Sequence, residues 1–405
     1  MLESAGWQNE TWPAEFRERV QAANSTQEAF EIMDELVCRL NDYHTRLSWP
    51  GGPRLASPPF RVEPVLADAT APADHGIWGQ AHPPVEMPAL KGVGIAVVQA
   101  ATNCGVRPGD EIISVDGIPV TEALAKAWRR AVCTSVAGKL RSAAGRMLQG
   151  PPDAELHLKI RRQAQATGEP LEGAVKRSRS PAEPTISKQE LDGVPLIRIS
   201  RWTSRPGDDL VAQFDDLLNQ YRHRPALVID VRGNGGGEDD LASKIVGRFL
   251  TAPVIASISF HRQVPGLTFE RTVDWTKPRG PWRYEGRVAV LTDEGCMSAT
   301  EHFVSGMAEA GALLCGTPTS GACGWIRRVQ LPGGATLNVS QTFPLHTGGI
   351  PSPELGIAPH LWAVRTLSDL QVGNDTALRA ALAWLNSTSP LPVRVQPMSN
   401  FSGTR

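Results

Sequence analysis

The sequence predicts an α/β core that follows a helical segment and a β-rich insert. Two observations support this prediction. From residue 194 onward, short apolar runs alternate with segments whose apolar residues recur at helical spacing, which is typical of a sheet covered by helices. Between residues 91 and 161, short strand-like runs instead surround Pro-Gly-Asp and Asp-Gly turns, and these turns favour β-hairpins.

The composition limits the class of protein. The chain has 405 residues, which is long for one hydrophobic core and favours two or three domains. Its 41 Lys and Arg nearly balance 42 Asp and Glu, so we expect no nucleic-acid or anionic-membrane partner. No apolar run approaches the roughly 20 residues that span a bilayer, so we expect no membrane span.

The amino terminus and the cysteines bear on the compartment. The start, MLESAGWQNETW, lacks the basic and apolar segments of a signal peptide. We therefore expect a cytoplasmic protein as the sequence stands, or a periplasmic or secreted one if a leader was removed. The six cysteines are scattered, which favours buried free thiols, although Cys296 and Cys323 flank the candidate site. No metal-ligand cluster is recognisable, so we expect neither a metal nor another cofactor.

The first half of the chain is predicted as two segments, 1–50 and 51–185. In the first, apolar residues recur at helical spacing over Glu28–Leu40, and Ser25 with Glu28 offers a capping start. In the second, the sequence predicts strands at 60–66, 95–98, 111–115 and 155–161, and helical structure over 122–148. Residues 165–190 are predicted to form a linker or a terminal strand.

The second half is predicted as a core, 186–372, and a carboxy-terminal helix and tail, 373–405. Buried strands are expected at 194–199, 226–231 and 288–292. Helices are expected at 208–223, 239–250, 298–310 and 375–385. Gly311 is placed to end the third of these helices.

Two segments of this core indicate chemistry. The glycine run Gly233–Gly237 follows a buried strand, and its backbone N–H groups are free to face a ligand. Ser298 follows another strand and begins a helix, where the dipole favours negative charge. Together these segments could form an oxyanion site beside a nucleophile. A structural alternative is that Ser298 and Glu301 form a capping box. A phosphate loop is excluded, because three acids follow the glycines.

A serine nucleophile needs a base, and the residues alone leave its identity open. No lysine follows Lys277 in the sequence. His44 lies far upstream in a polar turn, where a lone histidine is more often a surface or capping residue. Glu354 is a candidate carboxylate for orienting a base, and Asp293 and Glu301 are alternatives.

Two motifs carry a family resemblance. The segments Asp230–Gly237, DVRGNGGG, and Ser298–Glu301, SATE, resemble in type and order the motifs of the S41 peptidase family. That family contains the carboxy-terminal processing peptidases and the tricorn core protease. The resemblance implies a core of the ClpP/crotonase-like type. The run Gly105–Val120, GVRPGDEIISVDGIPV, resembles a PDZ domain of bacterial proteins.

The resemblance implies roles for single residues. Ser298 would be the nucleophile, but Ala322 stands where the processing peptidases have a catalytic lysine. The tricorn-like branch instead takes a histidine from a motif resembling Leu40–Thr45, which implies His44 as the base. A glutamate at the position of Glu354 would support it, within a segment where His360 replaces the family's aspartate.

The resemblance therefore implies a serine endopeptidase. Gly236 and Ala299 would donate the oxyanion hydrogen bonds, and the loop with Gly92 and Gly94 would receive a peptide carboxylate. The implied substrates are peptides or unfolded proteins, and a homo-oligomer is possible. Two alternatives stay open: a catalytically inactive S41-fold protein that binds peptides or ligands, and an amide or ester hydrolase of a biosynthetic pathway. His302 and His346 are the next candidates for the base.

Overall fold

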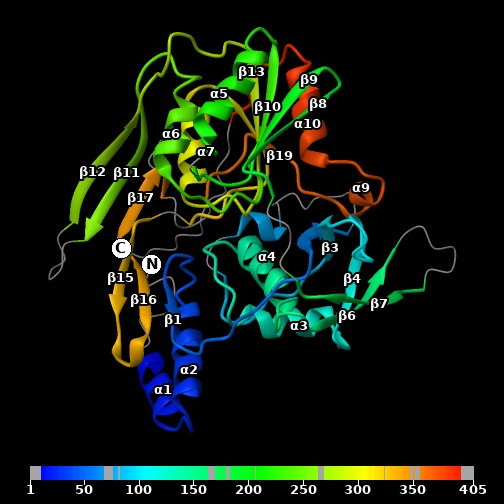
Figure 1. Cartoon of the computed structure of the whole chain (residues 1–405), viewed down its shortest axis with the longest axis vertical. Helices are drawn as coiled ribbons and strands as arrows, with labels where there is room; N and C mark the ends of the chain where they lie inside the picture. Colours follow the sequence, from blue (N-terminus) through cyan, green and yellow to red (C-terminus); the bar gives the residue numbers. More distant parts are fainter. Residues whose placement is uncertain are drawn as a thin grey trace. The chain divides into compact units, whose positions relative to one another are not determined.

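The computed structural model describes residues 11–67, 76–80, 83–162, 169–178, 183–205, 207–262, 269–322, 324–346, 350–351 and 356–393. The chain divides into two compact units (Figure 1). The first unit comprises Met1–Pro181, Trp325–Ser340 and Arg365–Asn374; the second comprises Ala182–Gly324, Gln341–Val364 and Asp375–Arg405. These units group the residues differently from the four predicted segments, because two late segments return to the amino-terminal half.

The first unit contains an antiparallel sheet in the order β2-β3-β4-β6-β7, with β5 paired to β4. Its strands are β2 (Phe60–Leu66), β3 (Val93–Ala100), β4 (Glu111–Val115), β5 (Ile118–Pro119), β6 (Glu155–Arg161) and β7 (Leu171–Lys176). The predicted bounds of β2, β4 and β6 are confirmed. A short 3₁₀ helix, η1, spans Gly76–Gly79. The PDZ character of this region stays a prediction.

The helical structure predicted over 122–148 is interrupted. The structure has α3 (Val120–Trp128) and α4 (Val136–Met147), separated by a turn. Ser135 causes the restart, because its hydroxyl accepts a hydrogen bond from the amide of Gly138 and so caps α4. The apolar pattern of the sequence does not show this cap, because apolar residues continue through the turn.

The amino-terminal helices belong to the same unit. They are α1 (Thr11–Gln21) and α2 (Thr26–Cys38), and the predicted cap is confirmed, because Ser25 accepts from the amide of Glu28. A small antiparallel sheet follows in the order β1 (Arg46–Ser48), β16 (Thr336–Ser340) and β15 (Ile326–Gln330), with the 3₁₀ helix η2 (Pro332–Gly334) between the last two. Phe30, Leu47 and Ala335 form the buried core here. The short helix α9 (Leu367–Gln371) completes the unit.

The second unit contains the predicted α/β core. Its sheet has the order β19-β14-β13-β10-β9-β8, parallel from β19 to β9, with β8 antiparallel at one edge. The strands are β8 (Ile186–Leu191), β9 (Val194–Ile199), β10 (Ala226–Asp230), β13 (Arg287–Thr292), β14 (Leu313–Gly316) and β19 (Leu361–Trp362). Every residue of β10 is buried, as expected for a central parallel strand covered on both faces.

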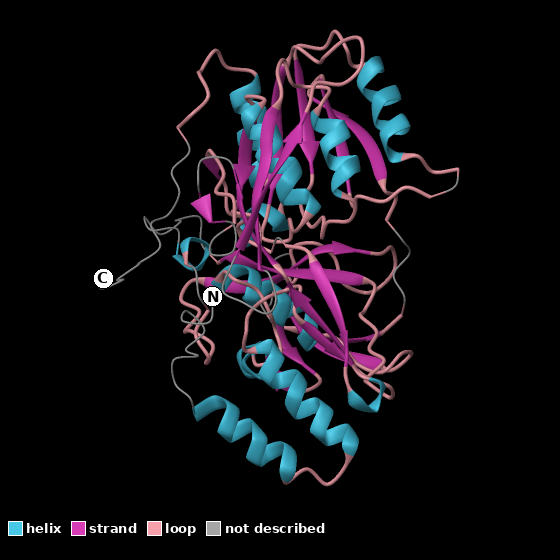
Figure 2. Cartoon of the chain, turned by 90° about the vertical axis from the view of Figure 1, so that its left-hand side faces the viewer, coloured by secondary structure: helices cyan, strands magenta, loops and turns pink. Residues whose placement is uncertain are grey.

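Helices cover both faces of this sheet (Figures 1 and 2). One face packs against α5 (Leu210–Gln220), α6 (Asp239–Val246) and α7 (Ala299–Glu309). The other packs against α10 (Thr376–Leu385). Gly311 has a φ of +83° directly after the last turn of α7, which confirms it as the helix stop.

Several strands of the second unit were not predicted. A separate antiparallel sheet has the order β12 (Phe269–Thr276), β11 (Val254–Arg262), β17 (Thr342–His346) and β18 (Ile350–Pro351). Among the described residues, no helix is long and apolar enough to cross a membrane.

Candidate active site

The glycine turn and the Ser298 turn lie next to each other. They follow β10 and β13, which are adjacent parallel strands with Asp230 opposite Leu291, so both turns leave the same edge of the sheet. A Cβ placed on Gly236 would lie 2.8 Å from Cβ of Ser298 and 3.4 Å from the amide nitrogen of Ala299. The structure therefore brings together three of the predicted site residues.

The backbone of Ser298 is strained. Its φ of 55° and ψ of −124° place a non-glycine residue in the left-handed half of conformational space, which costs on the order of 1–3 kcal/mol. Such strain clusters at functional sites, and a sharp strand-to-helix turn is the geometry that exposes a nucleophilic serine. Ser298 occupies the N-cap position of α7, but its side chain makes no capping hydrogen bond.

The alternative of a capping box at Ser298 and Glu301 is therefore wrong. The side chain of Glu301 is fully buried and has other partners. Its Oε1 accepts hydrogen bonds from the hydroxyl of Thr319 at 2.6 Å and from the amide of Gly321 at 2.8 Å. Glu301 thus secures the segment that follows β14, and it does not cap its own helix.

Asn234 holds the glycine turn against the Ser298 turn. This residue is fully buried, and its side-chain amide donates to the carbonyl of Ile199 at 3.2 Å. Its backbone carbonyl accepts from the amide of Met297 at 3.2 Å and from the hydroxyl of Thr300 at 2.9 Å. Thr300 in turn accepts from the indole of Trp202 at 2.8 Å. Buried, connected hydrogen bonds of this kind give the two turns one fixed arrangement.

The two predicted oxyanion donors differ in their surroundings. The amide of Ala299 is the first N–H of α7, so it has no acceptor inside the helix. The amide of Gly236 donates to Oδ1 of Asn234 at 3.0 Å. The helix therefore leaves the amide of Ala299 available to a ligand, whereas the amide of Gly236 would first have to exchange its acceptor.

Asp293 has a structural role between the same turns. Its Oδ1 accepts from the amide of Gly233 at 2.7 Å and from the amide of Gly295 at 2.9 Å. The thiol of Cys296 is fully buried and donates to the carbonyl of Val231 at 3.2 Å. Both side chains therefore bind the end of β10 to the turn after β13.

A buried arginine anchors the start of the glycine turn. Arg232 donates to both oxygens of Asp230 and to both oxygens of Asp375, which is the N-cap of α10. Burial alone would lower the pKa of Arg232, but the two carboxylates outweigh it and raise that pKa well above its ordinary value. Breaking such a buried network typically costs 3–5 kcal/mol, so Arg232 has a stabilising role.

Ala322 lies beside Ser298. Its carbonyl accepts the amide of Ser298 at 2.9 Å, and the amide of Ser320 donates to the carbonyl of Cys296 at 2.9 Å. Ala322 is 3% exposed. The position at which the family resemblance implies a lysine in processing peptidases is thus close to Ser298 and holds only a methyl group.

His44 belongs to the first unit and lies between α2 and β1. It is 8% exposed, so it is not a surface residue. Asp42 organises its turn: one carboxylate oxygen accepts from the amide of His44 at 3.1 Å and the other accepts from the hydroxyl of Thr45. The hydroxyl oxygen of Thr45 also accepts from the amide of Ser340 at 3.2 Å. The turn is therefore tied to β16.

A buried lysine contacts the same turn and gives a prediction for stability. Lys139 is 4% exposed, its amino group donates to Oδ1 of Asn41 at 2.7 Å, and burial lowers its pKa to about 8. An unfolded lysine has a pKa of about 10.4. The unfolded chain therefore holds the proton more tightly, and the contribution of this group to stability rises with pH between about 8 and 10.4.

Urea denaturation between about pH 7.5 and 10.4 checks this. The free energy of unfolding of Lys139→Met should lose this pH-dependent increase relative to the parent. Lys126→Met is the matched control, because Lys126 is exposed. Equal pH slopes for the parent and Lys139→Met would contradict the prediction.

The remaining predicted site residues lie elsewhere. Gly92 and Gly94 belong to the first unit, where β2 already pairs with one edge of β3 and Val65 lies opposite Gly94. Glu354 and Cys323 fall outside the described residues, as does the side chain of His346. Nδ1 of His360 accepts the amide of Leu314 at 2.9 Å. Among the described residues, no cluster of His, Cys, Asp and Glu could hold a metal ion.

Comparison with known proteins assigns a family to the part of the chain that contains the candidate site. Residues 193–361 match the family model described as Peptidase family S41. These residues belong to peptidase family S41. The S41 region contains β9, β10, β13 and α7, and so both turns of the candidate site.

Two relatives share sequence with the chain. The carboxy-terminal processing protease CtpB of Bacillus subtilis (strain 168) is 27% identical over 246 residues, which cover 60% of this chain and 45% of CtpB. The putative tricorn protease homolog 2 of Streptomyces coelicolor (strain ATCC BAA-471 / A3(2) / M145) is 27% identical over 186 residues, which cover 44% of this chain and 15% of that protein. The matches thus span less than half the length of either relative.

The fold also resembles a solved structure. Mature CPAF, solved in complex with lactacystin, has a TM-score of 0.69 and 16% sequence identity, over 95% of this chain and 92% of that one. At this identity the likeness shows the fold alone.

Proposed function

We propose that this protein is a serine peptidase in which Ser298 is the nucleophile. The observation that carries the proposal is the strained backbone of Ser298, at a strand-to-helix turn that contacts Gly236 within the S41 region. An ordinary helix start would place the serine in an extended conformation with its hydroxyl bonded to the helix. Here the side chain is instead half-buried and does not cap the helix, and the first helix amide lies next to it in the chain.

The chemistry follows from these groups. Oγ of Ser298 attacks the scissile carbonyl carbon, and His44 accepts the hydroxyl proton. The resulting oxyanion is bound by the amide of Ala299, and by Gly236 once that amide leaves Asn234. His44 then returns the proton to the leaving amine, and water hydrolyses the acyl-enzyme by the same route. Glu354 orients His44 in this proposal.

The β-rich part of the first unit would bind the substrate. In this proposal that part is a PDZ-like domain whose loop at Gly92 and Gly94 receives peptide. Since β2 occupies one edge of β3 at Gly94, a peptide strand would have to add at the opposite edge. The substrates would be peptides or unfolded proteins.

Labelling with a fluorophosphonate tests the nucleophile. We expect the folded protein to be labelled at Ser298, as located by mass spectrometry of peptides, and Ser298→Ala to be unlabelled. Denatured protein is the control, because the reaction needs an activated hydroxyl. A folded protein that cleaves peptides but stays unlabelled at Ser298 would contradict the proposal. Absence of both labelling and cleavage would favour the non-catalytic alternative.

A further inference from the structure

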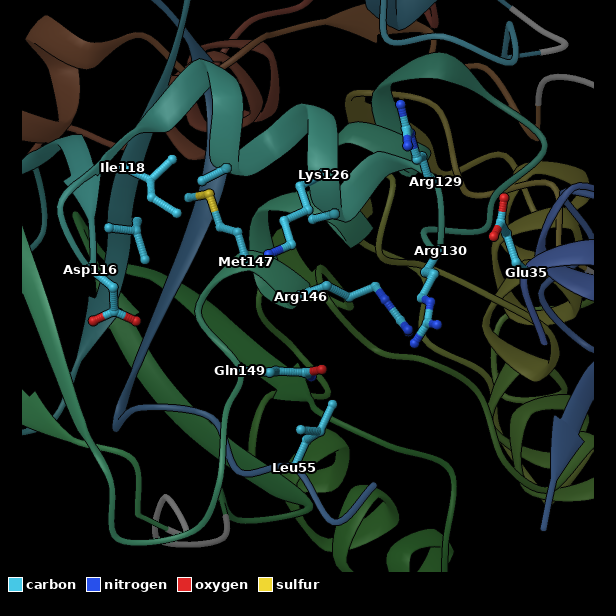
Figure 3. A pocket seen from close by; sticks show the side chains of 13 residues that line it. Glu35, Leu55, Asp116, Ile118, Lys126, Arg129, Arg130, Arg146, Met147 and Gln149 are labelled. Atoms are coloured by element: carbon cyan, nitrogen blue, oxygen red, sulfur yellow. The ribbon is translucent and has the colours of Figure 1, made fainter. Parts of the chain in front are cut away.

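A polar-rimmed pocket of about 650 Å³ lies in the first unit, between α3, α4 and the turn after β4 (Figure 3). Its apolar surface includes Ile118, Ala123 and Met147, and its basic residues are Lys126, Arg129, Arg130 and Arg146. No residue of β3 lines it, so it is separate from the loop at Gly92 and Gly94. The candidate active site does not use any of these side chains.

Two arginines converge in this pocket. Figure 3 shows the guanidinium groups of Arg130, which follows α3, and Arg146, on the last turn of α4, pointing toward one another. Like charges held together repel, and a guanidinium fork is suited to a carboxylate. Within the described ranges, the side chain of Arg146 makes no hydrogen bond or ion pair, and the side chain of Arg130 has only an ion pair with Glu31, at 4.0 Å.

The carboxylates that line the pocket are already engaged elsewhere. Glu35 accepts from Arg19 at 2.7 Å, and Asp116 accepts from Arg177 at 2.8 Å. Asp34, on α2, is close enough to attract Arg130 and Arg146, but it is one carboxylate beside the four basic side chains that line the pocket. The pocket therefore keeps a local excess of positive charge.

A second cavity indicates the path that a bound polypeptide would follow. This cavity, of about 350 Å³, shares Leu55, Arg130 and Arg146 with the first, so these three residues form a common wall. Leu55 is 50% exposed, which is unusual for a leucine beside two charges. The second cavity is also lined by Thr45 and Arg46, which directly follow His44. A polypeptide bound across this wall would therefore occupy both cavities, one on each side of the arginine pair.

We propose that this pocket binds the side-chain carboxylate of an acidic residue within an extended polypeptide. The carboxylate contacts Arg130 and Arg146, and a neighbouring aliphatic residue packs on Leu55 and the apolar lining. The two cavities on either side of the wall favour an internal residue over a chain terminus. The proposal rests on the proposed peptidase function only in treating this polypeptide as a substrate.

Binding of short peptides to the full chain carrying Ser298→Ala tests this without cleavage. The probe is a fluorescent peptide, capped at both ends, with one Glu between two Leu residues; its Gln counterpart is the control. We expect the Glu peptide to bind about tenfold more tightly, as for a charge-assisted hydrogen bond. Arg130→Gln or Arg146→Gln should remove that difference, and Arg146→Lys should restore part of it.

Arg129→Gln is the matched control, because Arg129 lines the same pocket but its guanidinium points away from the pair (Figure 3). Equal binding of the Glu and Gln peptides would overturn the proposal. An equal loss of binding with Arg129→Gln would also overturn the proposal, because it would indicate general electrostatic attraction. Stronger binding of inorganic phosphate, or of an uncapped peptide without Glu, than of the capped Glu peptide would overturn it as well. Intact fluorophosphonate labelling together with any of these results would leave the proposed function standing.

Discussion

Ser298→Ala and His44→Ala should each lower kcat/KM on a cleaved peptide by about 10⁴-fold or more, and the double variant should lose no more than either. The reason is that a nucleophile and its base act as one unit, so removing the second partner after the first has little further effect. The three variants and the parent would be compared on one peptide, with the melting temperature of each measured to confirm folding.

His302→Ala provides the control for the base. His302 is half-buried on α7, one turn beyond Ser298, and is the nearest alternative histidine in sequence. Its replacement should leave kcat/KM within about threefold of the parent, a change of under 1 kcal/mol. Full activity in His44→Ala would remove His44 from the mechanism, and additive losses in the double variant would show that the two residues do not act together.

Gly236→Ala should lower kcat by about 10²–10³-fold, the effect of losing one oxyanion donor. The new methyl group would lie 2.8 Å from Cβ of Ser298 and 2.9 Å from the carbonyl oxygen of Met297. It would also require a side chain at a φ of +101°. Either the Ser298 turn or the glycine turn must move, and a shift of about 1 Å is enough for such a loss.

Gly235→Ala is the matched control in the adjacent position. A Cβ there meets no atom of the described residues within 4 Å, and Gly235 is not in the left-handed region. Its kcat should stay close to that of the parent. Equal kcat values for Gly236→Ala and the parent, with both folded, would show that the contact at Gly236 does not determine the geometry of the nucleophile.

Much of the fold could be predicted from local hydrophobic patterns in the sequence. The strands β2, β4, β6 and β9 have the predicted bounds, because their apolar residues alternate or run together between clear turns. The strands β15 and β16 were missed for the opposite reason: their residues are exposed or half-buried, so they carry little hydrophobic periodicity. They pair with each other, and β1, far away in the sequence, pairs with β16.

The sequence by itself indicated that the glycine turn and Ser298 could form one site, because both follow buried strands of the predicted α/β core; the structure then made those two strands neighbours. The sequence also determined that no lysine follows Ser298. Three features of the site appear only in the tertiary structure. They are the strained backbone of Ser298, the hydrogen bonds that link Trp202 through Thr300 to Asn234, and the hydrogen bond between Glu301 and Thr319. These features depend on contacts between segments that are distant in the chain, and a local pattern such as a capping box cannot register them.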